Sequence, residues 1–175
     1  IVFGDWSSDV CSSDLGNVTL QNAILAPGNS AGILTFTDDV VMAASTTLAI
    51  ELLGNGDGSP VAGVDYDQLL FSGGTLDLTS NPTLTLDALY PSSIGAVFTI
   101  VSGGYSSGFF TYNSVVLGDL AILSADGKDF QIDYGAGGGF DITLTQIPEP
   151  RALALFALAA AAAALRSRRR APHDR

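Results

Sequence analysis

Short runs in which apolar and polar residues alternate follow one another along most of this chain, with turn-forming residues between them. The runs occupy residues 18–20, 33–37, 46–53, 66–71, 75–79, 83–89, 96–101, 120–123, 130–134 and 140–145. Alternation with a period of two is typical of strands that bury one face. Clusters of Gly, Ser, Asn, Asp and Pro mark turns at 26–30, 54–58, 72–74 and 80–82. No helical pattern precedes residue 152, so the sequence predicts an all-β fold.

Several of these runs repeat the theme Thr-Leu-x-Leu or a close variant, often after a glycine. The instances lie at residues 32–36, 47–52, 74–78 and 83–86. Short strands of this kind, stacked in register and separated by Gly or Asn turns, favour a β-solenoid with aliphatic side chains inside and Thr and Asp in water. A β-sandwich of the jelly-roll type uses the same strand lengths and turns and is the alternative.

Four segments resemble the passenger regions of autotransporters and related surface proteins: residues 25–34, 65–76, 95–101 and 139–145. This resemblance implies a fragment of a right-handed parallel β-helix. The chain departs from the autotransporter pattern because no translocator barrel follows the passenger-like region. A different C-terminal segment takes its place.

Residues 16–147 form an acidic body with a very unusual charge balance. It contains twelve aspartates, one glutamate and a single cation, Lys128, and it has no Arg and no His. Nucleic acid is excluded as a partner because no set of cations is present to neutralise phosphates. The only histidine, His173, lies in the C-terminal tail, so the body holds neither a histidine-based nucleophile triad nor a histidine zinc site.

The acids of the body are interpreted as solvated turn residues, and we expect no catalytic residue, no cofactor and no enzyme activity. Ca²⁺ is the alternative ligand, because Asp57, Asp65 and Asp67 lie in oxygen-rich segments of the kind that hard cations favour. Asp65 and Asp67 are expected on one face of a strand. A pair of carboxylates also suits glycoside hydrolysis, but the body lacks Trp to stack a sugar and Arg to fix a substrate.

Residues 1–15 are predicted to be a sequencing artefact. The eleven residues 5–15 match, one after another, the translation of a short-read sequencing adapter. If these residues are set aside, the protein loses its only Trp (Trp6) and its only Cys (Cys11). The body at 16–147 is then expected to be truncated at its N-terminus.

The C-terminal segment, residues 148–175, combines three features in a fixed order. Pro148, Glu149 and Pro150 come first, and residues 152–165 are all Ala, Leu or Phe. As a helix this stretch is about 21 Å long, slightly short for a full span. We expect a transmembrane helix at 152–165, with cytoplasmic arginines that set its orientation. These are Arg166, Arg168, Arg169 and Arg170.

This order of features resembles the PEP-CTERM sorting signal of Gram-negative bacteria. The resemblance implies export, a precursor anchored in the inner membrane, and processing by exosortase near Pro148, Glu149 and Pro150. The processed protein then belongs to the cell surface or the extracellular matrix. We therefore expect a structural surface protein with exosortase as partner and exopolysaccharide as a further partner. The alternatives are an adhesin or carbohydrate-binding module, or a polysaccharide-degrading β-helix enzyme.

Overall fold

The computed structural model describes residues 11–13, 17–54, 59–88 and 92–148, with the backbone alone at 11–13. In chain order the elements are β1 (Cys11–Ser13), β2 (Val18–Leu20), β3 (Ile24–Leu25), β4 (Ile33–Phe36), β5 (Val40–Met42), β6 (Thr47–Glu51), β7 (Gln68–Phe71), β8 (Leu76–Leu78), β9 (Thr83–Asp87), β10 (Val97–Ser102), β11 (Tyr105–Gly108), β12 (Thr111–Tyr112), β13 (Val115–Val116), β14 (Ile122–Ala125), β15 (Lys128–Gly135), α1 (Ala136–Gly139) and β16 (Asp141–Ile147).

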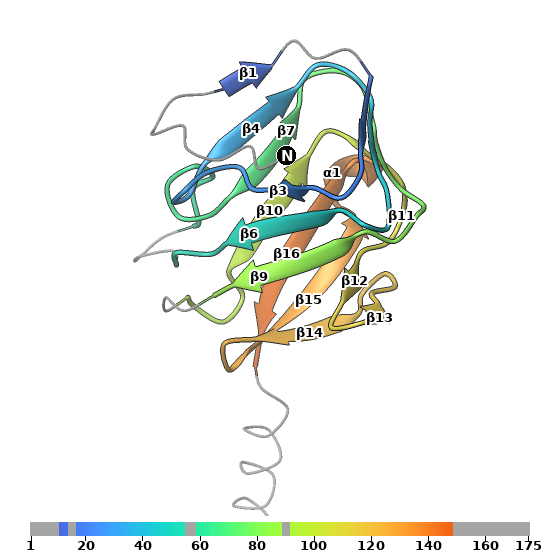
Figure 1. Ribbon diagram of the computed structural model, residues 1–175. Helices are drawn as coiled ribbons and strands as arrows, with labels where there is room; N and C mark the ends of the chain where they lie inside the picture. Colours follow the sequence, from blue (N-terminus) through green and yellow to red (C-terminus); the bar gives the residue numbers. More distant parts are fainter. Residues whose placement is uncertain (1–10, 14–16, 55–58, 89–91, 149–175) are drawn as a thin grey trace, which may run out of the picture.

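The strands form three sheets (Figure 1). The first has seven strands in the order β1-β4-β7-β10-β16-β15-β14, the second has four in the order β11-β8-β5-β2, and the third has five in the order β13-β12-β9-β6-β3. The predicted all-β class is confirmed, since the described residues are mostly strand with almost no helix.

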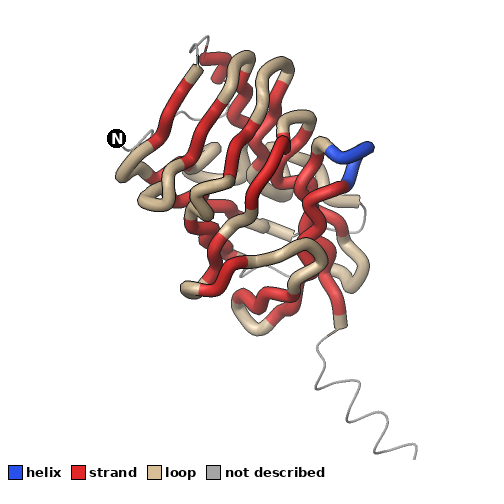
Figure 2. The backbone as a smooth tube through the Cα atoms, turned by 90° about the vertical axis from the view of Figure 1, so that its right-hand side faces the viewer, coloured by secondary structure: helices blue, strands red, loops and turns tan. Residues whose placement is uncertain are grey.

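Consecutive strands of the first half lie in different sheets, so the chain visits all three sheets before it returns to the first. Ile33 pairs with Gln68, Val40 with Leu76 and Thr47 with Thr83, always in parallel. Each circuit of the chain therefore lies directly against the previous one. Figure 2 shows the parallel strands as successive layers joined by loops at the edges.

Alternation along each strand separates the interior from the surface. Leu25, Leu48 and Leu84 occupy the same register on three neighbouring strands and are buried. Thr47 and Thr83 share the preceding register position and lie on the outer face, where they are partly exposed. Stacked leucines of this kind supply most of the hydrophobic stabilisation of such a fold.

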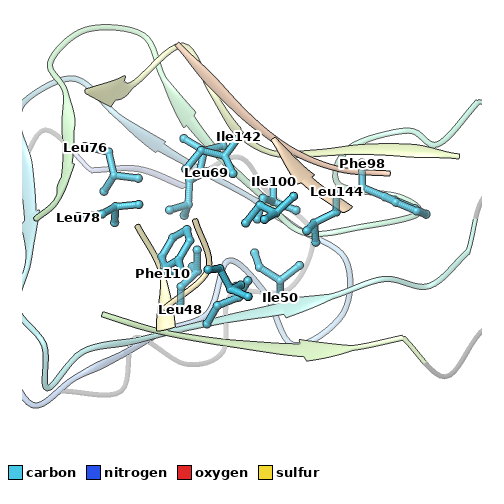
Figure 3. Close-up of a cluster of buried hydrophobic side chains, with 14 of the residues drawn as sticks. Leu48, Ile50, Leu69, Leu76, Leu78, Phe98, Ile100, Phe110, Ile142 and Leu144 are labelled. Atoms are coloured by element: carbon cyan, nitrogen blue, oxygen red, sulfur yellow. The ribbon is translucent and has the colours of Figure 1, made fainter. Parts of the chain in front are cut away.

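The core lies between the three sheets, and Figure 3 shows side chains from all of them directed into it. Leu69, Ile100 and Leu144 come from the seven-stranded sheet, Leu76 from the four-stranded sheet and Leu48 from the five-stranded sheet; all are fully buried. One continuous hydrophobic cluster thus holds the sheets together.

The C-terminal part of the chain changes from parallel to antiparallel pairing at β10. On one side β10 pairs in parallel with β7, and on the other it pairs antiparallel with β16. Next in the sheet, β16 pairs antiparallel with β15, and β15 with β14. Residues 139–145, which resemble a passenger repeat, therefore belong to an antiparallel sheet rather than to another parallel layer. The four-residue connection Ala136–Gly139 reverses the chain between β15 and β16. The two-residue turn Asp126-Gly127, where both residues have positive φ as hairpin turns of type I′ require, reverses it between β14 and β15.

The helix expectations need one correction. Residues Ala136–Gly139 form the four-residue element α1, although no helix was expected before residue 152. Gly137 and Gly138 have left-handed backbone angles within it, so it is a tight connection rather than a regular helix. The predicted membrane helix at 152–165 lies outside the described residues. In the part of the chain that the structure describes, no helix has the length and hydropathy of a membrane span.

Candidate functional site

The junction between the β-domain and the C-terminal segment is held firmly by both neighbours of β16. Thr145 pairs with Val97 of β10, and Ile147 pairs with Asp129 of β15. The Gln146 N–H donates to the Ala96 carbonyl at 2.9 Å, and the Gln146 carbonyl accepts the Gly95 N–H at 2.8 Å. Gln146 is 9% exposed. The chain therefore belongs to the sheet up to Ile147.

Pro148 is the first residue beyond the sheet, and it is exposed. Proline has no N–H to donate to a strand ladder, so pairing stops here for a chemical reason. The other residues predicted for sorting lie outside the described residues: Glu149, Pro150, Arg166, Arg168, Arg169 and Arg170. The structure thus places the predicted processing motif immediately after a central strand, with no linker before it.

Asp67, a predicted calcium candidate, is buried and makes contacts within the fold. It is 1% exposed. Its Oδ1 accepts the N–H of Gly32 at 2.9 Å, and its Oδ2 accepts the N–H of Glu51 at 2.9 Å. Gly32 precedes β4 and Glu51 ends β6, so one carboxylate joins two points of the preceding circuit. Both carboxylate oxygens of Asp67 therefore accept hydrogen bonds from the backbone.

Burial raises the pKa of Asp67 to about 7, because the charged form has lost its water. The two backbone N–H groups oppose this rise, and the negative charge of Glu51 adds to it. A buried carboxyl with a shifted pKa is often a sign of a functional site. Here the hydrogen bonds to Gly32 and Glu51 give the burial of the Asp67 carboxyl a structural explanation.

Asp65 does not share a strand face with Asp67, which corrects the expectation from the sequence. It lies in the turn before β7, and its Oδ2 accepts the N–H of Val61 at 2.8 Å. The strand begins only at Gln68. Asp57 lies outside the described residues. Within the described ranges, no three acidic, His or Cys side chains gather in a way that could hold a metal ion.

Aspartates elsewhere in the fold repeat the role of Asp67, a pattern that the sequence reading did not detect. Asp39 accepts the N–H of Thr75, Asp126 that of Ala88 and Asp141 that of Gly103, at 2.7 to 2.8 Å. Each bond joins residues 36 to 38 positions apart. The preference for Asp over Glu at turns was the available signal, because the short side chain reaches nearby backbone donors.

Tyr134 organises a cluster of aromatic side chains between the parallel layers and the antiparallel end. Its ring contacts Tyr105, Phe109 and Phe110, with centroids 5.5, 5.1 and 6.4 Å away. Its hydroxyl accepts the Phe110 N–H at 2.9 Å. Burial raises the pKa of Tyr134 far above its ordinary value. Phe110 is fully buried, and Tyr105 and Phe109 pack against the core, so this segment closes the hydrophobic interior.

Comparison with known families identifies the segment that begins in β16. The chain carries a PEP-CTERM protein-sorting motif. The match covers residues 146–170, which include Pro148, Glu149, Pro150 and the arginine cluster. Neither a curated protein nor a solved structure matches the chain.

The PEP-CTERM motif indicates an exported protein that is targeted to exosortase, which is the processing partner that the motif implies. The resemblance seen in the sequence is thereby confirmed. The structure adds one fact about the motif: its first two residues, Gln146 and Ile147, are part of the central strand β16. The folded domain and the sorting signal therefore share residues.

Proposed function

We propose that this protein is a non-enzymatic structural component of the cell surface or extracellular matrix, released to its site by exosortase processing near Pro148, Glu149 and Pro150. The observation that carries the proposal is the direct continuation of an acidic β-domain into a PEP-CTERM motif. The precursor is held in the inner membrane by residues 152–165, with the arginines in the cytoplasm.

The architecture suits a structural role. The parallel pairing of β2 to β12 over three sheets supports the proposal of a parallel β-helix of the autotransporter-passenger kind. Stacked layers of this kind are stabilised by contacts with their neighbours, which yields elongated and robust surfaces. Asp39, Asp67, Asp126 and Asp141 are committed to backbone donors. This commitment favours a scaffold over a carboxylate enzyme.

Processing near Pro148 leaves the domain intact, because β16 makes its last ladder contact at Ile147. The proposal therefore includes a mature protein that ends close to the sheet and needs nothing from the tail for its fold. Exopolysaccharide of the matrix is proposed as a partner that surrounds the protein without occupying a specific binding site.

The experiment is a pulse-chase of the full chain in a host that has exosortase, with cell fractions separated. We expect wild-type precursor to be shortened and released, and the variant Glu149→Ala to remain in the membrane fraction at full length. Glu51→Ala is the matched control, since it removes the same carboxylate from the body. Processing of Glu149→Ala at the wild-type rate would show that the motif does not act as a sorting signal.

The structural role has its own test with the purified domain. We expect no new reducing ends when it is incubated with matrix polysaccharides, and no retention on polysaccharide beads beyond that of an acidic control protein. Release of reducing ends would establish the enzyme alternative. Specific retention would establish the carbohydrate-binding alternative.

A further inference from the structure

A row of four uncharged side chains crosses the outer face of the sheet beside the exit of the tail. Val97, Thr145, Gln131 and Ile122 stand in register on β10, β16, β15 and β14. We call these four residues the exit row. Their neighbours along the strands point inward and are buried: Phe98, Leu144, Ile132 and Leu123. The exit row therefore faces outward.

The two ends of the exit row are aliphatic and exposed. Val97 is 46% exposed and Ile122 is 54% exposed. The exit row itself carries no charge, and Asp129 and Asp133 flank Gln131 on the same face of β15. Centres of protein interfaces are depleted of charge and enriched in such apolar positions. The strand spacing makes the row about 14 Å wide, the size of a small docking patch.

The tail leaves the sheet next to this row. Ile147 lies two residues after Thr145 on β16, so the two side chains point to the same face. Figure 1 shows β16 ending at the lower rim of the domain, close to β14 and β15. Pro150, the last residue of the Pro-Glu-Pro triplet, is three residues after Ile147. A fully extended chain therefore places Pro150 within about 11 Å of Ile147.

An enzyme that encloses Pro148, Glu149 and Pro150 must therefore touch the domain. We propose that the exit row is a docking surface for exosortase, which reads the body beside the tail as well as the motif itself. This inference rests on the proposed processing by exosortase. The short connection between β16 and the motif, together with the outward direction of the row, commits the surface to that partner.

The test compares processing rates of the full chain in the exosortase host. We expect Val97→Glu and Ile122→Glu each to slow processing about fivefold, which is ~1 kcal/mol of lost binding. Val64→Glu is the matched control, because Val64 is 67% exposed in the turn before β7. The melting temperature of each purified variant shows whether its fold is intact. Wild-type processing of folded Val97→Glu and Ile122→Glu overturns the proposal.

A second set of variants separates docking from effects on export. A flexible Gly/Ser spacer of about twelve residues between Ile147 and Pro148 moves the motif roughly 19 Å away on average. With this spacer, we expect Val97→Glu to be processed at the same rate as its parent. A slow rate that persists with the spacer contradicts direct docking.

Two further experiments test whether lipid or a second copy of the chain occupies the exit row instead. Flotation of the purified domain with phospholipid vesicles, lost in Val97→Glu, would assign the row to lipid and overturn the proposal. A dimer in sedimentation that Val97→Glu abolishes would assign it to a second copy and overturn it too. If Glu149→Ala is not processed but Val97→Glu is fully processed, the docking proposal is refuted and the sorting proposal stands. Processing of Glu149→Ala refutes the sorting proposal itself.

Discussion

The carboxylate of Asp67 accepts the backbone N–H of Glu51 at 2.9 Å, and the backbone N–H of Asp67 donates to the Glu51 carbonyl at 3.0 Å. The two residues are thus joined twice, across the gap between β6 and β7. Because Asp67 is buried, its ionisation affects the stability of the whole domain.

Stability is expected to fall as the pH rises through the range in which Asp67 ionises. Its pKa is about 7 in the folded protein and about 3.9 in an unfolded chain. The folded state therefore binds the proton more tightly. The stabilisation from this group is complete below about pH 4 and is lost by about pH 7, a change of roughly 2–4 kcal/mol. Urea unfolding between these pH values measures it.

Asp67→Asn supplies the comparison for this effect. The variant cannot ionise, so its free energy of unfolding should vary less with pH than that of the parent. Its amide group also presents an N–H donor to either Gly32 or Glu51, which makes the variant less stable at acidic pH. Equal pH dependence in both proteins would refute the assignment to Asp67.

The domain is expected to keep its stability without calcium. The carboxylates of Asp65 and Asp67 already accept backbone N–H groups, so binding a cation there would break existing hydrogen bonds. Millimolar Ca²⁺ or excess EDTA should leave the melting temperature unchanged in differential scanning fluorimetry. A rise of several degrees with Ca²⁺, lost in Asp57→Asn, would instead identify a site at the turn that contains Asp57.

Removal of the Tyr134 hydroxyl should lower the free energy of unfolding by about 1–2 kcal/mol, because the buried N–H of Phe110 loses its acceptor. Tyr134→Phe retains the ring contacts with Tyr105 and Phe109. Tyr112→Phe is the control, since its hydroxyl bonds to the Ser124 carbonyl in a water-accessible place. Chemical denaturation compares the two. Equal small losses would show that the hydroxyl of Tyr134 is dispensable.

Truncation of Phe98 should be among the most damaging single changes in the core. Its ring contacts Tyr66 at 5.5 Å and Phe130 at 6.3 Å, so it connects the parallel layers to the antiparallel end. Phe98→Ala is expected to cost about 3–5 kcal/mol. The neighbouring exposed residue provides the control, with Val97→Ala changing stability by less than about 1 kcal/mol. Thermal unfolding that fails to separate the two variants would contradict this packing.

Two glycines with positive φ should respond differently to alanine. Gly74 has φ +68°, and an added Cβ would lie 2.2 Å from the carbonyl carbon of Asp38. Gly95 has φ +88° with nothing within 4 Å of the added atom. We expect Gly95→Ala to cost about 1 kcal/mol from backbone strain alone, and Gly74→Ala to cost roughly 3 kcal/mol or more. Urea midpoints that are equal would contradict the close approach at Gly74.

Alternation predicted the strands well where apolar and polar residues alternate within them. The runs at 33–37, 75–79 and 83–89 correspond to β4, β8 and β9. By contrast β5 has three residues, Val40–Met42, and β12 has only two, Thr111–Tyr112. All three residues of β5 are apolar and β12 is too short, so neither strand shows alternation in the sequence. They exist because neighbouring layers supply their hydrogen-bond partners, as Thr75 does for Val40.

The sequence carries a signal for part of the antiparallel pairing. Asp126-Gly127 lies between the strand-like runs at 120–123 and 130–134, and this dipeptide is a strong short-range signal of a hairpin. Asn113-Ser114 plays the same role between β12 and β13, again with positive φ at both positions. Both turns lie near the end of the chain, where the parallel layers cease.

The sequence by itself determined the strand-rich class, the direction in which leucines and threonines face, the acidic character and the sorting motif. These properties follow from local periodicity, composition and contiguous residues. Only the tertiary structure decided which strands pair, that Asp67 is buried between Gly32 and Glu51, and that the PEP-CTERM motif begins inside a sheet. The reason is that pairing and burial depend on residues one full circuit apart, and no local pattern records that distance.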